Sequence, residues 1–381
     1  MVKLFHLQKK HGTRRDDLSN ENDEIYEMKM NDLFELRSLA DDVRAFSQGS
    51  KHLPTIMIVG LVSTYDNYVA KLLESVFTKK PSILSSSAKD MTFADLCRFD
   101  SIEEARSSIV AKEVETVIRM SHHDQFDWME KRFAIPLREG LSILPIFIEL
   151  CERRNLFAHT GGFVSKQYLA AGQTHKYDVT SVKVGDQLEA DPLYFNIAVE
   201  AVYEVGAKLG YVLWRKFADE NVAAIDEAFN NLAYGLIYKK HYAVAEKLLG
   251  FAVETLNKRK GLEATRRRMV INLANACRLQ GNKEKAAKIL GREDWSAVDD
   301  VFNICIAAVR EETKEVARLI RKLGRSDSMS SLIYKTWPVF RGVDMDEDVR
   351  KALLDVFGEE MIPVSAKKDL DDNGHDKILL H

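Results

Sequence analysis

The feature that most constrains the fold is the spacing of apolar residues, which recur every three or four positions along most of the 381-residue chain. This period matches one face of an α-helix, whereas the alternation with a period of two that is typical of strands is scarce. A chain of this length can bury a full hydrophobic core and divides into two or three domains. The sequence therefore predicts an all-α protein.

Composition narrows the classes of function. The formal net charge of -3 argues against a general coat for nucleic acid, so any RNA contact must be local. The four cysteines are scattered with no CxxC pair, which indicates small core residues in a reducing compartment rather than a disulfide frame or a zinc site: Cys97, Cys151, Cys277 and Cys305. Neither a secretory signal nor a run long enough to cross a membrane is found, so we expect a cytoplasmic protein without membrane contact. Glycine patterns for phosphate or dinucleotide binding are missing too, and no cofactor is expected.

Turn and capping signals divide the chain into expected helices. The expected helices cover 20–48, closed by Gly49; 54–78, with Pro54 near its start; 102–119; a segment 126–159 broken at Pro136 and Pro145; and 192–217. Asp191 and Pro192 form a strong start signal, with aspartate as N-cap and proline at the first helical position. Between 161 and 191 we expect a loop with a short hairpin.

A weak internal repeat begins near residue 221. The run Asn231-Leu232-Ala233 recurs 41 residues later as Asn272-Leu273-Ala274, and a fainter echo follows near Cys305. Small residues at fixed positions let paired helices approach closely, as stacked helical hairpins require. This segment resembles degenerate tetratricopeptide-type repeats; a plain helical bundle is the alternative.

The stretch Arg154-Asn155-Leu156-Phe157-Ala158-His159, followed by Thr160-Gly161-Gly162, carries the clearest chemical signal. On a helix Asn155 and His159 share a face, which Glu152 joins one turn earlier, while Arg154 points elsewhere. Arg154 meets the same ligand only if the last turn unwinds, which the glycines permit, or if a second copy contributes. A guanidinium and an imidazole suit the handling of a phosphodiester. The alternative is a surface arginine and a capping histidine on an ordinary helix.

The surrounding sequence resembles the HEPN superfamily of all-helical ribonucleases. The motif of that superfamily is an arginine, a polar residue, about three variable residues and a histidine. The matching pieces lie at 126–133, 135–138, 152–159, 162–168, 194–195 and 213–217, within about residues 50 to 220. The resemblance implies metal-independent cleavage of RNA through attack of the ribose 2'-hydroxyl. His159 would move the proton, Arg154 would neutralise the phosphoryl oxygens, and Asn155 would orient the phosphate or the imidazole. A catalytically inactive, nucleotide-binding version is the alternative.

The resemblance also implies a two-fold homodimer, because members of the superfamily pair two motif helices in a composite site. Asp66, on the helix expected beside the motif, could brace Arg154 or His159, or could merely satisfy a helix dipole in the first turn. Glu152 is a supporting residue on the motif helix. Tyr168 would contact RNA or be a core aromatic whose hydroxyl is satisfied.

Two further clusters invite chemical interpretations. The pair His122-His123 with Asp124 suggests a metal, but adjacent histidines on a helix diverge and no third ligand is spaced to join them, so we expect a solvated loop or helix start. The densest basic cluster is expected between two repeat helices, where it would contact the RNA backbone or be solvated: Lys258, Arg259, Lys260, Arg266, Arg267 and Arg268.

These observations predict four segments: an N-terminal helical extension (1–50), a HEPN-like catalytic domain (51–220), tetratricopeptide-like repeats (221–325), and a C-terminal helical segment with a flexible tail (326–381). The HEPN resemblance implies a metal-independent endoribonuclease that acts as a toxin or anti-phage effector. A protein trigger or regulator would bind the repeat domain, since repeat surfaces suit such partners. The alternative from another class is a non-catalytic helical scaffold.

Overall fold

The computed structural model describes residues 13–15, 26–27, 29–86, 91–257, 263–326 and 329–358. Within these ranges the chain is all-α, as predicted, and its one sheet is the antiparallel pair of β1 (Thr13–Arg14) and β2 (Tyr26–Glu27). The expected C-terminal tail lies outside the described residues. No helix within the described part is both long and apolar enough to cross a membrane.

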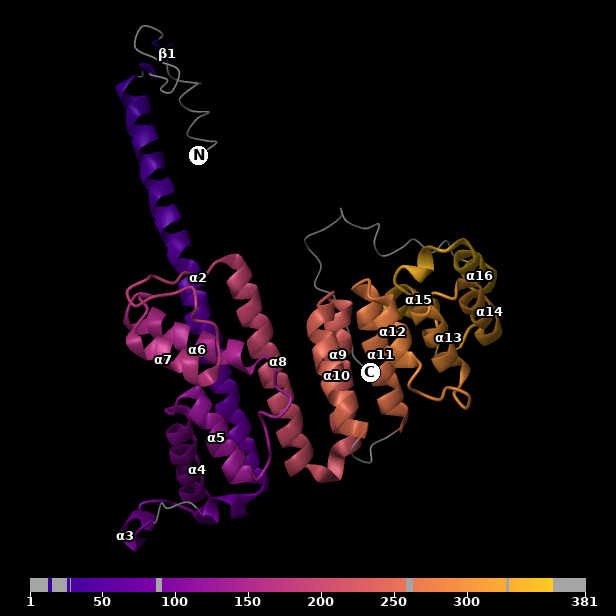
Figure 1. Ribbon diagram of the computed structural model, residues 1–381, viewed down its shortest axis with the longest axis horizontal. Coiled ribbons are helices and arrows are strands. Elements are labelled where there is room, and N and C mark those ends of the chain that lie inside the picture. Colours follow the sequence, from indigo (N-terminus) through magenta and orange to yellow (C-terminus); the bar gives the residue numbers. More distant parts are fainter. Residues whose placement is uncertain are drawn as a thin grey trace. The chain divides into compact units, whose positions relative to one another are not determined.

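The chain forms two compact units, and each is described by itself. Unit 1 contains the described residues within Met1–Glu74 and Ala88–Val205, and unit 2 those within Ser75–Ser87 and Gly206–His381. The helices that supply unit 1 are α2 (Met30–Lys79), α3 (Phe93–Leu96), α4 (Ile102–Ile118), α5 (His122–Phe133), α6 (Leu144–His159), α7 (Lys166–His175) and the first half of α8 (Pro192–Phe217) (Figure 1).

Helix α2 replaces two expected helices with one of 50 residues that passes through Gly49 and Pro54. A glycine costs a helix about 1 kcal/mol and a proline about 3 kcal/mol, and these finite penalties are offset by the rest of the helix. From Ile58 onward the helix buries one face with spacings of three and four: Ile58, Val62, Tyr65, Val69, Leu73 and Val76. This buried face packs α2 against α5 and α6, as the contacts of the Tyr65 ring with the His122 ring of α5 and the Phe147 ring of α6 show.

Local capping chemistry sets the bounds of the remaining helices in unit 1. The Ser101 side chain caps α4, the Ser121 side chain caps α5, and the Asp191 carboxylate accepts from the Tyr194 N–H at 2.7 Å to open α8, as predicted. Pro145 lies in the first turn of α6 and does not kink it, because the N–H that proline lacks has no helical partner there.

Helix α7 occupies Lys166–His175, where a loop was expected, so that part of the expectation was wrong. The Ser165 side chain caps α7 at Tyr168 N–H. Gly172, which suggested a loop, is required for packing, because a Cβ there would lie 2.3 Å from Val179 Cγ1. Short antiparallel pairing is present on either side of α7: Phe163 forms a bridge with Gln187, and backbone hydrogen bonds join Gly162 to Leu188 and Val164 to Gly185 and Asp186.

Unit 2 is built of consecutive helix pairs: α9 (Val222–Tyr238) with α10 (Tyr242–Asn257), α11 (Glu263–Leu279) with α12 (Lys283–Leu290), and α13 (Asp300–Val309) with α14 (Thr313–Leu323). The short helix α15 (Ser331–Thr336) and then α16 (Glu347–Phe357) follow, and α16 packs on α14. Short single-turn helices lie at Pro81–Ser86, Asp219–Asn221, Pro338–Phe340 and Val343–Met345. The small residues of the repeat are fully or almost fully buried where helices approach: Ala233, Ala245, Ala274, Ala286 and Ala317.

Candidate functional site

The motif residues lie on α6, which remains helical through His159. The helix ends at Thr160, whose N–H donates to the Leu156 carbonyl at 2.8 Å, and the Gly162 N–H donates to the same carbonyl at 3.1 Å. Both glycines adopt positive φ after the helix rather than within it. The last turn therefore does not unwind. His159 follows Arg154 by five helical positions, which is about 7.5 Å along the axis and about 140° around it.

Arg154 belongs to a polar cluster made by three helices, which we name the Arg154 cluster: Asp66 (α2), His122 (α5), and Glu152 and Arg154 (α6). Asp66 is at its centre. Its Oδ2 is 3.6 Å from Arg154 Nη2, and its Oδ1 is 2.8 Å from His122 Nε2. The His122 side chain is 7% exposed and its ring meets the Phe147 ring edge-on. A carboxylate thus joins the motif arginine to a buried histidine.

The Arg154 guanidinium is held near Asp66 but makes no hydrogen bond within the described residues. The Asp66 oxygen at 3.6 Å is an ion-pair partner beyond hydrogen-bond length. Its Nε–H is buried and has no acceptor among those residues. A guanidinium has five N–H donors in a fork that fits carboxylate and phosphate, so Arg154 retains unused donor capacity. About one fifth of its side chain is exposed.

Burial shapes the acid–base chemistry around Arg154. Burial raises the pKa of Glu152, and the nearby charges of His122 and Arg154 lower it only in part. Burial likewise raises the pKa of the Cys151 thiol well above its ordinary value, and Asp66 adds to this effect. Cys151 is therefore a neutral core residue, as expected, whereas Cys97 is exposed.

The other two motif residues face a different environment. His159 is exposed and Asn155 is half-buried, and neither side chain makes a hydrogen bond within the described residues. The continuous helix places Glu152, Asn155 and His159 on one face, as the spacing predicted. Of these three residues, Glu152 also interacts electrostatically with His122 and Arg154.

The structure resolves the two interpretations of Asp66. Because α2 begins at Met30, Asp66 lies deep inside the helix, and a role in satisfying the dipole of the first turn is wrong. The expected contact with Arg154 is present, and within the described residues Asp66 has no contact with His159.

Tyr168 lies in the core, in agreement with its interpretation as a core aromatic whose hydroxyl is satisfied. Its hydroxyl donates to Glu149 Oε1 at 2.7 Å, and the side chain is 2% exposed. Glu149 also accepts from Tyr194 at 2.8 Å and from Arg153 Nε at 2.7 Å. Arg153 donates to the Glu189 carbonyl as well and lies over the Tyr194 ring. This buried network ties α6, α7 and α8 together.

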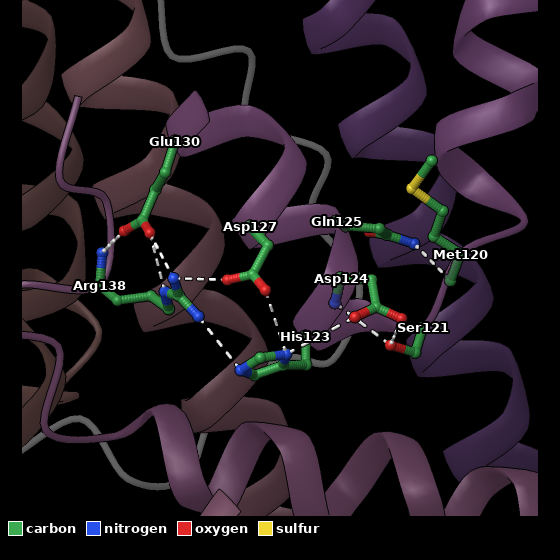
Figure 2. Close-up of polar contacts among 8 residues, drawn as sticks. All are labelled: Met120, Ser121, His123, Asp124, Gln125, Asp127, Glu130 and Arg138. Atoms are coloured by element: carbon green, nitrogen blue, oxygen red, sulfur yellow. Dashed lines mark hydrogen bonds and ion pairs between the residues drawn. The ribbon is translucent and has the colours of Figure 1, made fainter. Parts of the chain in front are cut away.

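A second polar cluster surrounds Arg138, and we name it the Arg138 cluster: His123, Asp124, Asp127, Glu130 and Arg138 (Figure 2). The guanidinium donates to Glu130 Oε2 from Nε at 3.0 Å and from Nη2 at 2.5 Å, and Nη2 is also 2.5 Å from Asp127 Oδ1. Its Nη1 is 3.1 Å from His123 Nε2. The His175 ring of α7 packs against His123 in a tilted arrangement, with centroids 4.2 Å apart.

The Arg138 cluster corrects one sequence argument about metal binding. His122 is directed at Asp66, so the two histidines diverge as expected, but Asp127 joins His123 and Asp124: one ligand atom from each of these three lies within 4.8 Å of the others. However, an arginine can only donate, so His123 Nε2 accepts and the ring proton is on Nδ1. That proton faces the two carboxylates at 3.8 Å, so the nitrogen that would bind a metal lacks a free lone pair. Arg138 is the cation of this cluster.

The basic residues predicted for RNA are arranged differently from the expectation. Lys258, Arg259 and Lys260 lie outside the described residues. The other three arginines are inside the first turns of α11 rather than between helices, and all pair with carboxylates: Arg266 with Glu293, Arg267 with Glu263, and Arg268 with Glu227.

Sequence reasoning missed His122 as a neighbour of the motif. The sequence indicated only that His122 could lie at a helix start. The structure confirms this, since His122 is the first residue of α5. Asp66 precedes it by 56 residues, and no local pattern reports such a contact. Arg138 was also missed, although it follows Glu130 by only eight residues.

Comparison with known proteins adds no relative: no protein-family model, no curated protein and no solved structure matches this chain.

Proposed function

We propose that this chain is a metal-independent endoribonuclease of the HEPN type that works as a homodimer. The observation that carries the proposal is the state of Arg154, which is fixed beside Asp66 yet has unused hydrogen-bond donors. Arg153 next to it and Arg138 in the same unit have their donors engaged by protein acceptors. A positioned guanidinium with free donors is suited to bind phosphate oxygens.

The chemistry needs a proton carrier and a charge stabiliser. The ribose 2'-oxygen attacks phosphorus as its proton leaves to an imidazole, the bond to the 5'-oxygen breaks, and that oxygen takes a proton. The products are a 2',3'-cyclic phosphate and a 5'-hydroxyl. His159 is exposed at the end of α6 and transfers the protons, while Arg154 stabilises the negative charge that builds on the phosphoryl oxygens.

The regular geometry of α6 supports a composite site. One helix separates Arg154 from His159 by about 140° of rotation, so a single copy does not direct both at one phosphate. Two copies related by a two-fold axis would supply two imidazoles and two guanidiniums to one linkage. Asn155, on the His159 face, would orient the phosphate.

The test is cleavage of a single-stranded RNA oligonucleotide and of transfer RNA by the purified full chain in the presence of EDTA. We expect products that end in a cyclic phosphate. His159→Ala should lower the rate by about 100- to 10,000-fold. His241→Ala is the matched control, because it removes another exposed histidine in the α9–α10 turn and should leave the rate unchanged.

The outcomes separate the candidate functions. Undiminished cleavage by His159→Ala would eliminate the mechanism. Nucleotide binding without cleavage, detected as a thermal shift that Arg154→Ala removes, would instead support a nucleotide-binding protein. A chain that neither cuts nor binds, yet retains a protein partner in both variants, would be a helical scaffold.

The cellular role that the HEPN resemblance suggests is that of a growth-arresting toxin or anti-phage effector in the cytoplasm, with a trigger or regulator bound by the helix pairs of unit 2. Induced expression in bacteria should arrest growth for the wild type and not for Arg154→Ala. Sequencing of cellular RNA ends would then identify the target.

A further inference from the structure

The residue that the proposed mechanism leaves unused is His122. It is the first residue of α5, next to the N-cap Ser121, and its side chain is almost fully buried. The ring packs against two aromatic rings that also contact each other, with centroids 6.0 Å from Tyr65 and 5.7 Å from Phe147. These contacts and the burial of the side chain restrict rotation of the imidazole.

His122 Nε2 is directed at Asp66 Oδ1, 2.8 Å away. An ionised carboxylate only accepts, so Nε2 carries a proton and donates it. The bond holds one oxygen of Asp66 in place, which leaves the second oxygen, Oδ2, facing Arg154 Nη2. Within the described residues His122 is the sole hydrogen-bond donor to the Asp66 side chain.

The titratable and charged groups around His122 come from two helices. Asp66 and Tyr65 belong to α2, while Glu152 and Arg154 belong to α6. Of these, Asp66 has the direct hydrogen bond. The contacts therefore form a chain in which α5 holds a carboxylate on α2, and that carboxylate holds the guanidinium on α6.

We propose that His122 is a positioning residue that sets the orientation of Arg154 through Asp66. The effect of this role on catalysis rests on the proposed nuclease function, whereas the positioning of Arg154 by His122 and Asp66 does not. Arg154 has no hydrogen bond of its own within the described residues, so the electrostatic pull of a fixed Asp66 is what directs its guanidinium. Loss of the His122 bond would free the carboxylate to turn and would release the arginine.

The geometric part can be tested without RNA. In the full chain with ¹⁵N-labelled histidine, the His122 signals should show a proton on Nε2, and Asp66→Asn should shift them. In a crystal structure of His122→Leu, the Arg154 guanidinium should leave Asp66 and lie beyond ion-pair distance, about 4 Å. A His122 proton on Nδ1 alone, or an Arg154–Asp66 pair unchanged in His122→Leu, would overturn the proposal.

The catalytic part compares His122→Leu with His122→Gln, whose amide can still donate to Asp66. We expect His122→Leu to lower kcat by about 10- to 100-fold with little change in KM, as is usual when a supporting residue is lost. His122→Gln should recover most of that loss and keep the pH profile of the wild type. A misfolding effect would instead lower the amount of active enzyme in both variants.

Two catalytic results would overturn the proposal. One is a wild-type kcat for His122→Leu. The other is a His122→Gln variant as slow as His122→Leu with one limb of the pH profile lost, because His122 would then transfer protons itself. If the wild type does not cut RNA at all, the nuclease assignment fails, while the tautomer and the crystal structure still decide the role of His122.

Discussion

The Arg154 cluster and the Arg138 cluster contain the same kinds of side chain in the same unit, yet they differ in how the arginine is satisfied. Arg138 donates from Nε and Nη2 to Glu130. Its Nη2 also pairs with Asp127, and its Nη1 lies within hydrogen-bond distance of His123. Arg154 has one carboxylate neighbour at 3.6 Å and a buried Nε–H without an acceptor in the described residues. Arginine, histidine and aspartate together therefore do not define a binding site.

This contrast indicates which cluster can bind a ligand. A guanidinium whose donors are taken up by carboxylates must break those bonds to bind phosphate, and bonds to charged groups contribute about 1.5–3 kcal/mol each. A guanidinium with free donors has no such cost. We expect the Arg138 cluster to stabilise the fold and the Arg154 cluster to act on a substrate, and four predictions test that division.

The largest effect is expected from a substitution that keeps charge but removes the guanidinium fork. Arg154→Lys should lower kcat by about 100- to 1,000-fold, because a lysine cannot make two parallel bonds to a phosphate. The change leaves the charge of the cluster intact, so unfolding should be affected little. Single-turnover cleavage of an RNA oligonucleotide is the measurement.

Arg106→Lys on the exposed face of α4 is the matched control and should retain the wild-type rate. If Arg138→Lys loses as much activity as Arg154→Lys while remaining folded, the division between the two clusters is wrong.

The sequence predicted the helices where the chemistry that begins them is local. Ser101 and the Asp191-Pro192 pair mark helix starts by contacts within three or four residues, and the observed helices begin there. Gly172 misled, because glycine is a loop signal by itself and its packing role depends on Val179, which lies in a later segment. The α7 helix was missed for that reason.

The candidate site was predictable only in part, for a related reason. The motif on α6 is continuous in the chain, so Arg154, Asn155 and His159 could be found by spacing. The partners of Arg154 come from α2 and α5, which meet α6 only through the packing of apolar faces. Periodicity shows that a helix has a buried face, but it does not show which polar residue on another helix ends up beside it.

The second prediction concerns stability, for which we expect Arg138 to matter more than Arg154, the reverse of their expected effects on activity. Arg138→Met should lower the free energy of unfolding by about 1.5–3 kcal/mol, since it leaves Glu130 and Asp127 without their charged partner. Arg154→Met should cost less, because no hydrogen bond within the described residues is lost. Urea unfolding of the full chain measures both. Equal losses would contradict the contrast.

The third prediction uses pH, because the pKa of the glutamate is lowered in the Arg138 cluster and raised in the Arg154 cluster. Burial alone would raise the pKa of Glu130, but hydrogen bonds from the side chain and backbone of Arg138 bring it below its usual range. Its stabilising effect is therefore present above the ordinary pKa, about 4.3, and is lost as pH falls through the depressed value. For Glu152, burial raises the pKa, so its ionisation opposes folding at neutral pH and ceases to do so in acid.

Accordingly, Glu130→Gln should destabilise the protein at pH 8 and Glu152→Gln should stabilise it, each by about 1 kcal/mol. Between about pH 8 and pH 5 the gain from Glu152→Gln should shrink, while the loss from Glu130→Gln should remain. Melting curves at several pH values measure this. A gain from Glu152→Gln that grows in acid would show that its pKa is lowered rather than raised.

The smallest effect is expected in unit 2, where the same rule applies to the arginines at the start of α11. Arg267 and Arg268 are engaged by Glu263 and Glu227, so each would have to exchange a carboxylate for a phosphate in order to bind RNA. Replacing both by glutamine should change RNA affinity by less than about twofold and leave its salt dependence unchanged. Each phosphate contact to single-stranded RNA contributes about 0.7 to the slope of log affinity against log salt. A slope that falls by about 1.4 in the double variant would therefore mean that these arginines do bind the backbone, and that a carboxylate partner is not enough to mark a guanidinium as structural.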